Sequence, residues 1–361
     1  MPQVDGYSVR APGRVCLFGE HSDYLGLDAV AAAIDLVVKM SVRPREDNVV
    51  HVSLKDTGES ITLDLSDLGP YQHARDYVRA AFRVLQKHGF SMRGADIEVS
   101  GAVPMGAGLS SSSALTVAAI LAGCSLAGVR PAPSQLVEMA YQAEVVEFDE
   151  SGGLMDHSAS VYGGLVHIEP VSPLRVTRLP AIVDGLVIGD CGIKKQDTVG
   201  DLRRIRRSVE RGYAALTEAL GEFEPRSTPL HDVLSVADTI PERYRRITIT
   251  TLRNRDLTAR AVAYLRLPHP SPETLGTMID EHHRLLRDGF GTSIEPIEAL
   301  IEAAKNAGAL GCKINGSGRG GTMLAYAPGR ENEVMGAIRE MGGSPQLVRV
   351  SGGASVNLMS I

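Results

Sequence analysis

Apolar residues alternate with polar ones, or form short apolar runs, through most of residues 7–101, as they do in β-strands. Glycines and polar residues separate these runs, so we expect strands at 7–11, 15–21, 29–43, 49–56, 60–66 and 95–101. Residues 73–89 instead place apolar side chains at helical spacing and stop at Gly89, a typical end of a helix. This part of the chain is therefore predicted to be a sheet with one helix.

A glycine- and serine-rich loop at 104–113 leads into a segment, 114–127, that is apolar on nearly every side and predicts a buried helix. A second helix is expected over 133–149 and a strand over 163–170. From residue 185 onward helices predominate, with a strand at 185–191 and helical stretches at 201–220, 252–266, 272–289 and 297–311. Two strands joined by a glycine turn (312–327), a helix (331–343) and a last strand (344–352) complete a split βαβ pattern.

The composition favours a two-domain protein of the α/β or α+β class. The chain has 361 residues, 43% hydrophobic and 22% charged, which is enough for two domains that each bury a core. The 37 Lys+Arg and 43 Asp+Glu residues give a net charge of −6 without a basic cluster, which argues against nucleic-acid binding. We place the domains at 1–184 and 185–361, where the texture of the sequence changes.

Cysteine usage and the apolar segments point to the cytoplasm. The four cysteines are scattered without a CxxC pair, so neither a zinc site nor a disulfide framework is expected and a reducing compartment is. The start of the chain lacks a charged segment followed by an apolar run, so no signal peptide is expected. The most apolar windows are too short or too interrupted to cross a bilayer, and no membrane partner is predicted.

The segment 104–114, PMGAGLSSSSA, has the residues of a phosphate-binding loop. Glycines let the backbone approach a ligand, and the first turn of the helix that follows offers free N–H groups and a positive dipole end. Serine hydroxyls can cap the helix or reach a cation bound to the phosphates. An ordinary flexible turn with an N-cap is the alternative, but it needs one serine and one glycine. No GK pair follows, so this is not a Walker A loop.

The segment 315–321, NGSGRGG, satisfies G-x-G-x-x-G through Gly316, Gly318 and Gly321, so a dinucleotide-binding oxidoreductase must be weighed. The following TMLAYA is strand-like rather than helical, which removes the context that this motif needs. We expect the turn to bring backbone N–H groups to the same phosphate site as 104–114. A purely structural hairpin turn remains the alternative.

Charged residues crowd the segment 11–28, in which Arg14, Glu20, His21 and Asp23 lie between strands. A solvated loop would explain such a cluster by base rate. Sugar hydroxyls, however, both donate and accept hydrogen bonds, and this set of side chains can satisfy them. Asp156 follows two glycines among small and apolar residues, where a carboxylate is costly unless it is used or paired. The adjacent histidine at 157 is interpreted as structural.

Together these segments resemble the GHMP kinase superfamily, and within it the galactokinases. PGRVCLFGEHSDYLG resembles the galactokinase signature, PMGAGLSSSSA the phosphate loop and KINGSGRGGTMLAY the third glycine motif. QAEVVEFDESGGLMDH is similar to the family's stretch from a magnesium-binding glutamate to the catalytic aspartate. The matches follow the family's order over nearly the whole chain.

The resemblance implies an α+β fold of two domains with the active site in the cleft between them. The N-terminal domain would be ribosomal protein S5 domain 2-like and the C-terminal domain ferredoxin-like. The implied reaction is transfer of the γ-phosphoryl group of ATP to a small sugar, in galactokinases to its anomeric hydroxyl, with Mg²⁺ as cofactor. The implied assembly is a monomer or homodimer.

The resemblance also assigns roles to particular residues. Asp156 would be the catalytic carboxylate, with Arg14 beside it to keep it ionised and to stabilise developing charge. Sugar hydroxyls would be held by Glu20, His21 and Asp23, with the backbone around Gly153 closing the pocket. Ser112 and Glu144 match the magnesium ligands. The phosphates would lie against Gly106, Ala107, Gly108, Leu109, Ser110, Ser111 and Ser112, and the third motif would contribute Gly316, Gly318 and Gly320.

Several positions depart from the galactokinase pattern. Leu202 or a neighbour stands where a tyrosine commonly contacts the sugar, Cys16 replaces an asparagine, and Lys194 and Lys195 could reach an acidic group. The glutamine usual after the catalytic aspartate is His157, and Arg319 stands where the third motif commonly has a bulky apolar residue. The acceptor could therefore be galactose, a related aldose, a sugar acid or a longer sugar. Two further hypotheses are another alcohol, as in mevalonate or homoserine kinases, and a sugar- and ATP-binding sensor without activity.

Overall fold

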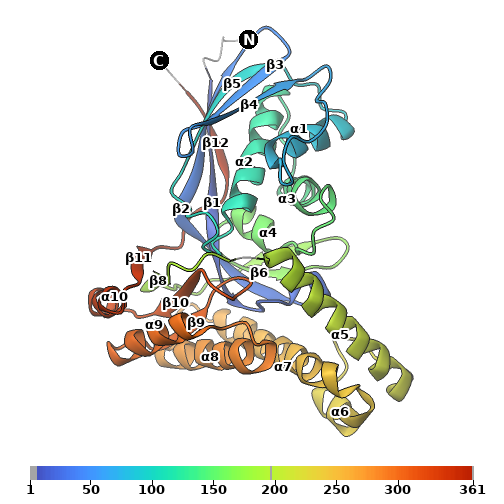
Figure 1. Cartoon of the computed structure of the whole chain (residues 1–361), viewed down its shortest axis with the longest axis vertical. Coiled ribbons are helices and arrows are strands. Elements are labelled where there is room, and N and C mark those ends of the chain that lie inside the picture. The colour runs from blue at the N-terminus through green and yellow to red at the C-terminus, as the bar shows by residue number, and fades with distance from the viewer. Residues whose placement is uncertain (1–5, 196, 360–361) are drawn as a thin grey trace.

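A twisted eight-stranded sheet forms one half of the molecule (Figure 1). The computed structural model describes residues 6–195 and 197–359. The strands lie in the order β12-β1-β2-β5-β3-β4, and β6 pairs with the beginning of β2 and with β7. Their bounds are β1 (Tyr7–Phe18), β2 (Ala29–Pro44), β3 (Val49–Leu54), β4 (Glu59–Asp64), β5 (Ala95–Gly101), β6 (Leu165–Glu169), β7 (Arg175–Arg178) and β12 (Ser355–Leu358).

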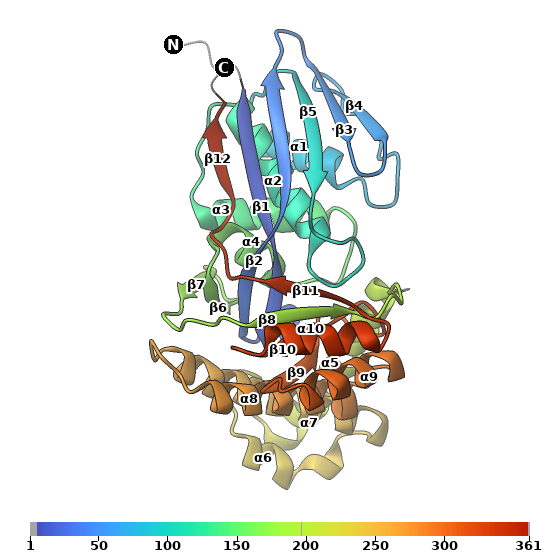
Figure 2. The same ribbon diagram turned by 90° about the vertical axis from the view of Figure 1, so that its left-hand side faces the viewer.

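Four helices lie on one side of this sheet, behind it in Figure 2. They are α1 (Tyr77–Lys87), α2 (Ser111–Leu126), α3 (Pro133–Tyr141), which a π-helical turn extends over Gln142–Val146, and α4 (Met155–Tyr162). α2 is buried on nearly every side because β1 and β2 pack on it from one direction and α1, α3 and α4 from others. The buried helix predicted over 114–127 is thus confirmed, and it begins at Ser111, inside the serine run.

A four-stranded antiparallel sheet organises the other half. Its order is β11-β8-β10-β9, which confirms the split βαβ, ferredoxin-like arrangement. The strands are β8 (Leu186–Asp190), β9 (Gly311–Ile314), β10 (Thr322–Tyr326) and β11 (Ser344–Val348). The helices are α5 (Thr198–Leu220), α6 (Leu230–Ser235), α7 (Glu242–Leu265), α8 (Pro272–Arg284), α9 (Glu295–Asn306) and α10 (Glu331–Glu340). The two-domain α+β fold expected from the sequence is therefore present.

Several elements differ from the sequence prediction: the strands expected at 7–11 and 15–21 are one strand, β1, and β7, α6 and β12 were not expected. For α7 and β12 the difference has a physical reason. α7 begins at Glu242, whereas the apolar pattern predicted a start at 252. The pattern missed the first part of the helix because its inner face carries threonines instead of apolar residues. Thr248, Thr250 and Thr251 are buried, and each hydroxyl donates to the carbonyl four residues earlier. β12 was not predicted, because SVNL is short and half polar; it pairs with residues 7–10 of β1. The chain therefore returns to the first sheet at its end. The division at 184/185 stays a prediction.

Within the described residues, no helix combines the length and the apolar character that crossing a membrane requires. The four cysteines are free thiols, and Cys16, Cys124 and Cys312 are buried. The signal-peptide expectation concerns the first residues of the chain, of which 1–5 lie outside the described structure.

Candidate active site

A cavity of about 700 Å³ lies where the two halves meet, and most of the predicted site residues line it. Its walls come from the loop after β1, the loop before α2, the start of α4 and the segment between β8 and α5. The lining residues that were predicted are Arg14, Glu20, His21, Asp23, Gly106, Gly108, Ser110, Ser111, Ser112, Glu144, Gly153, Asp156 and Gly316. Four predicted residues do not line it: Ala107, Leu109, Gly318 and Gly320.

Asp156 lies in the first turn of α4 and directs its carboxylate into this cavity. Arg14 on β1 donates from Nε to Oδ1 of Asp156 at 2.7 Å, and its Nη2 lies 2.7 Å from the same oxygen in an ion pair. Ser110 Oγ donates to Oδ2 at 2.6 Å. Three segments that are distant in sequence therefore meet at one carboxylate, which is 29% exposed and accessible to a ligand.

Arg14 also contacts the glycine- and serine-rich loop at 104–113, called the phosphate-type loop below. Its Nη1 donates to the carbonyl oxygen of Gly108 at 2.7 Å. Burial by itself lowers the pKa of Arg14, but the charges of Asp156 and Glu20 outweigh that effect and raise the pKa above its ordinary value. The guanidinium is therefore a fixed positive charge between the loop and Asp156.

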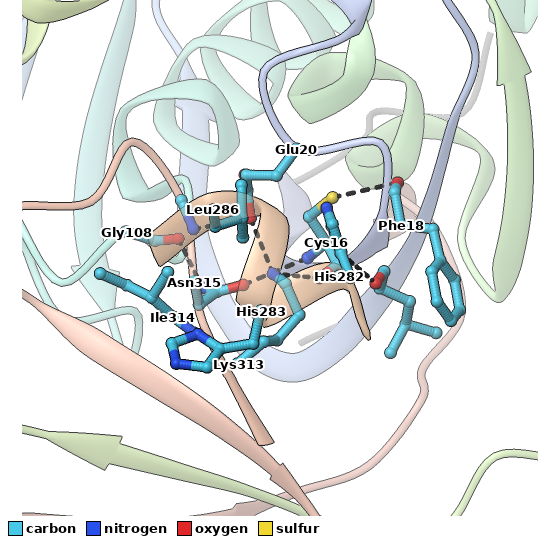
Figure 3. Close-up of polar contacts among 12 residues, drawn as sticks. Cys16, Phe18, Glu20, Gly108, His282, His283, Leu286, Lys313, Ile314 and Asn315 are labelled. Atoms are coloured by element: carbon cyan, nitrogen blue, oxygen red, sulfur yellow. Dashed lines mark hydrogen bonds and ion pairs between the residues drawn. The ribbon is translucent and has the colours of Figure 1, made fainter. Parts of the chain in front are cut away.

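Glu20 is held by a lysine that the sequence pattern did not single out (Figure 3). Lys313 on β9 is completely buried, and its Nζ donates to Glu20 Oε2 and to the Cys16 carbonyl, both at 2.9 Å. The backbone N–H of Gly316 donates to the same Oε2 at 2.9 Å. Burial acts to raise the pKa of Glu20, but Lys313 and Arg14 lower it to about 2. Glu20 is thus an ionised carboxylate, and none of the described residues donates to its Oε1.

His21 and Asp23 complete this side of the cavity. His21 Nδ1 lies 2.8 Å from the Tyr24 hydroxyl, and burial lowers the pKa of His21 to about 4, so the ring is neutral near pH 7. Asp23 Oδ2 accepts from the Met155 N–H at 2.9 Å, and burial raises the pKa of Asp23 to about 6. A Cβ atom on Gly153 would lie 2.1 Å from Asp23 Oδ2, so Gly153 is needed for this close approach.

The two glycine motifs lie against each other. Asn315 Nδ2 donates to the Gly108 carbonyl at 2.8 Å, and Thr322 Oγ1 donates to the Ala107 carbonyl at 2.8 Å. Asn315 Oδ1 also accepts from the Cys16 N–H at 3.2 Å, so one amide side chain joins the strand β1 to both motifs (Figure 3). β10, not a helix, follows NGSGRGG, so the dinucleotide-binding context is absent.

Glu144 and Ser112 meet at the start of α2. Glu144 Oε2 lies 2.7 Å from His157 Nε2. Burial acts to raise the pKa of Glu144, but His157 and the hydroxyls of Ser112 and Ser113 lower it overall. One carboxylate and a hydroxyl beside a phosphate-type loop form the oxygen set that Mg²⁺ uses when phosphates supply its other ligands. Among residues 6–195 and 197–359, no three or more His, Cys, Asp and Glu side chains gather as a metal cage of their own.

Three family models match the chain. The model of the GHMP kinases N terminal domain covers residues 76–164, the model of the GHMP kinases C terminal region covers 262–343, and the galactokinase galactose-binding signature covers 3–44. The last of these contains Arg14, Glu20, His21 and Asp23.

Curated relatives cover nearly the whole chain. The mevalonate kinase of Thermococcus sibiricus is 28% identical over 350 residues, which are 94% of this chain and 95% of that protein. The galactokinase of a Roseiflexus species is 30% identical over 329 residues (88% and 82%), and the mevalonate kinase of Methanothermobacter thermautotrophicus is 30% identical over 331 residues (92% and 93%).

Solved structures share the fold. Lactococcus lactis galactokinase complexed with galactose superposes with a TM-score of 0.86 at 20% identity, covering 98% of this chain and 95% of that one. Methanococcus jannaschii mevalonate kinase superposes with a TM-score of 0.73 at 16% identity, covering 97% and 100%.

Proposed function

The chain belongs to the GHMP kinase family of phosphotransferases that act on alcohol groups, and on this premise we propose that it transfers the γ-phosphoryl group of ATP to the anomeric hydroxyl of galactose or a related sugar. The observation that carries the proposal is the placement of Asp156 and Arg14 beside three buried polar residues, Glu20, His21 and Asp23. The galactose-binding signature covers four of these five residues.

The residues of the cavity account for the chemistry of phosphoryl transfer. Asp156 would accept the hydrogen bond of the attacking hydroxyl and orient its oxygen toward phosphorus, and Arg14 would balance the negative charge that develops. Free N–H groups at the start of α2 would bind the phosphates. Ser112 and Glu144 would hold Mg²⁺, which when bound neutralises charge on the transferred group.

The hydrogen-bonding groups of the pocket favour a sugar over mevalonate, which the matched archaeal kinases are named for. Glu20, Asp23 and the neutral His21 can accept hydrogen bonds from several hydroxyl groups, whereas a carboxylate placed against Glu20 and Asp23 would be repelled. Of the cations that line the cavity nearby, Arg14 is already paired with Asp156, and Lys195 lies between the two glycine motifs.

The test is ADP release with Mg-ATP against galactose, other aldoses, uronic acids, heptoses and mevalonate, with the product read by phosphorus NMR. We expect turnover on a neutral sugar that yields a 1-phosphate. Turnover on mevalonate alone would overturn the sugar assignment. No turnover on any acceptor, with ATP binding intact, would make the protein a sensor instead of an enzyme.

A second prediction concerns Asp23. Asp23→Asn keeps an oxygen that can accept from the Met155 N–H but removes the charge, so we expect the acceptor KM to rise about tenfold or more, while the ATP KM changes less than about threefold. Asp28→Asn is the matched control, because Asp28 lies on the same segment but does not line the cavity. An equal rise of both KM values in Asp23→Asn would place Asp23 outside the acceptor pocket.

A further inference from the structure

Lys195, in the segment between β8 and α5, reaches the place where the two glycine motifs meet. A Cβ atom on Gly108 would lie 2.5 Å from Lys195 Nζ, and a Cβ atom on Gly316 would lie 2.7 Å from it. Nζ also donates to the Asn315 carbonyl at 3.3 Å. Gly108 and Gly316 have φ values of 82° and 75°, a left-handed conformation that glycine adopts without strain, and a side chain at either position would meet the ammonium group.

Lys195 differs from the other two cations at the site in having no ion-pair partner among the described residues. Arg14 is paired with Asp156, and Lys313 is paired with Glu20. Lys195 forms no ion pair with any described residue, although it lines the cavity. Burial lowers its pKa to about 8. The charges of Glu20 and Asp156 act against this lowering, but neither carboxylate is within ion-pairing distance, and Lys195 stays partly exposed. The N–H groups that Asn315 does not use are therefore available to an anion that enters the cavity.

We propose that Lys195 binds the γ-phosphoryl group of ATP and stabilises the charge on it during transfer. Arg14 and Lys195 both contact Gly108, Arg14 through the carbonyl oxygen and Lys195 beside the α-carbon, so the two cations flank the same loop. Arg14 is already paired with Asp156, whereas N–H groups of the Lys195 ammonium are available to donate to phosphate oxygens. The inference rests on the proposed use of ATP as phosphoryl donor.

The step itself needs no proton from Lys195. The bond between the γ-phosphorus and the β,γ-bridging oxygen breaks, a bond from phosphorus to the acceptor oxygen forms, and ADP leaves. The acceptor's proton goes to solvent, directly or by way of Asp156. Lys195 keeps its protons and donates hydrogen bonds to the transferred group, where positive charge lowers the barrier.

The binding test compares Mg-ADP with Mg-AMP-PNP, a nucleotide that carries a γ-phosphoryl group but does not transfer it. Titration calorimetry is done on wild type, Lys195→Met, Lys195→Arg and Lys194→Met. We expect Lys195→Met to weaken AMP-PNP binding about tenfold or more, to change ADP binding less than about threefold, and to lower kcat about 10²-fold or more. Lys194→Met is the matched control, because the neighbouring lysine is exposed and does not line the cavity.

A pH profile gives a second readout. Wild-type kcat/KM for ATP should fall as the pH rises through about 8, because Lys195 loses its proton there. Lys195→Arg keeps its charge at higher pH, so this alkaline limb should disappear in that variant while AMP-PNP binding is largely retained.

Three results are decisive. Equal weakening of ADP and AMP-PNP by Lys195→Met, or unchanged nucleotide binding with a raised acceptor KM, would overturn the assignment of Lys195 to the γ-phosphoryl group. An alkaline limb that persists in Lys195→Arg would overturn it as well. Failure of the proposed function is distinguishable, since wild-type protein would then not bind Mg-AMP-PNP or would not turn over.

Discussion

Asp156→Asn is expected to lower kcat about 10³-fold or more while Mg-AMP-PNP binding stays within a few-fold of wild type. Asparagine has nearly the same shape, so Arg14 and Ser110 can still hold the side chain. It carries no negative charge and cannot take up a proton, so the attacking hydroxyl loses the group that orients and activates it. Because the interaction is made with the acceptor and not with ATP, the loss appears in turnover.

Steady-state kinetics, calorimetry and a thermal melt measure these quantities together. Asp149→Asn is the matched control, since the Asp149 side chain is fully exposed and its nearest cation is the solvent-exposed Arg203. Activity of Asp156→Asn within a few-fold of wild type would show that this carboxylate does not act on the reacting hydroxyl. A large fall in melting temperature with proportionate loss of nucleotide binding would assign Asp156 and Arg14 to stability instead.

The local motifs were predictable because each of them is contiguous in sequence. A glycine- and serine-rich run before an apolar helix specifies a loop and a helix start wherever the rest of the chain lies. In the structure Gly108 and Ser110 lie close to Asp156, and Arg14 contacts both Asp156 and Gly108. The proposed catalytic group therefore follows from short segments plus one long-range pairing.

The residues that contact these motifs from other parts of the chain were not predictable, because they are far from the motifs in the sequence. In the sequence Lys313 is a single charged residue near the start of a predicted strand, and its ion-pair partner Glu20 is 293 positions away. Lys195 was noted only as a cation near the acceptor, and no sequence pattern places it against Gly108 and Gly316. A charge in a strand signals function only when its burial is known, and burial is a property of the fold.

Asn315 illustrates how such distant partners act. The sequence departs from the galactokinase pattern at Cys16, where an asparagine is usual, so β1 lacks an amide side chain at that position. In the structure Asn315 bonds both to the Cys16 N–H and to the Gly108 carbonyl. An amide from the third glycine motif therefore connects β1 with the glycine- and serine-rich loop before α2.

Lys313→Met is expected to destabilise the protein by about 3–5 kcal/mol and to make acceptor binding depend on pH. The methionine fills a similar volume but leaves the Glu20 carboxylate buried without its main counter-charge. Burial, which acts to raise the pKa of Glu20, is then opposed mainly by Arg14, so the pKa of Glu20 rises from about 2. In this variant kcat/KM for the acceptor should fall additionally as the pH decreases and Glu20 takes up a proton. The wild-type profile should show only the fall near pH 6 at which Asp23 takes up a proton.

The free energy of unfolding of the wild type should depend on pH through the ionisation of Glu20. Because folding lowers the pKa of Glu20, its contribution is fully present above pH 4.5 and is lost as the pH falls toward about 2. Denaturant melts at a series of pH values measure it. Lys305→Met, which removes a partly exposed lysine paired with Asp280, is the matched control and should cost no more than about 1 kcal/mol.

The double variant Glu20→Gln/Lys313→Met separates stability from acceptor recognition. Without a buried charge on either side, most of the lost stability should return, because the cost of the single variant is mainly that of an unpaired ion. The acceptor KM should nevertheless stay high and no longer vary with pH, since glutamine at position 20 offers the sugar no charged oxygen. If the double variant were as unstable as Lys313→Met, the two residues would not be energetic partners. A wild-type acceptor KM in the double variant would remove Glu20 from the acceptor pocket and leave Lys313 a purely structural residue.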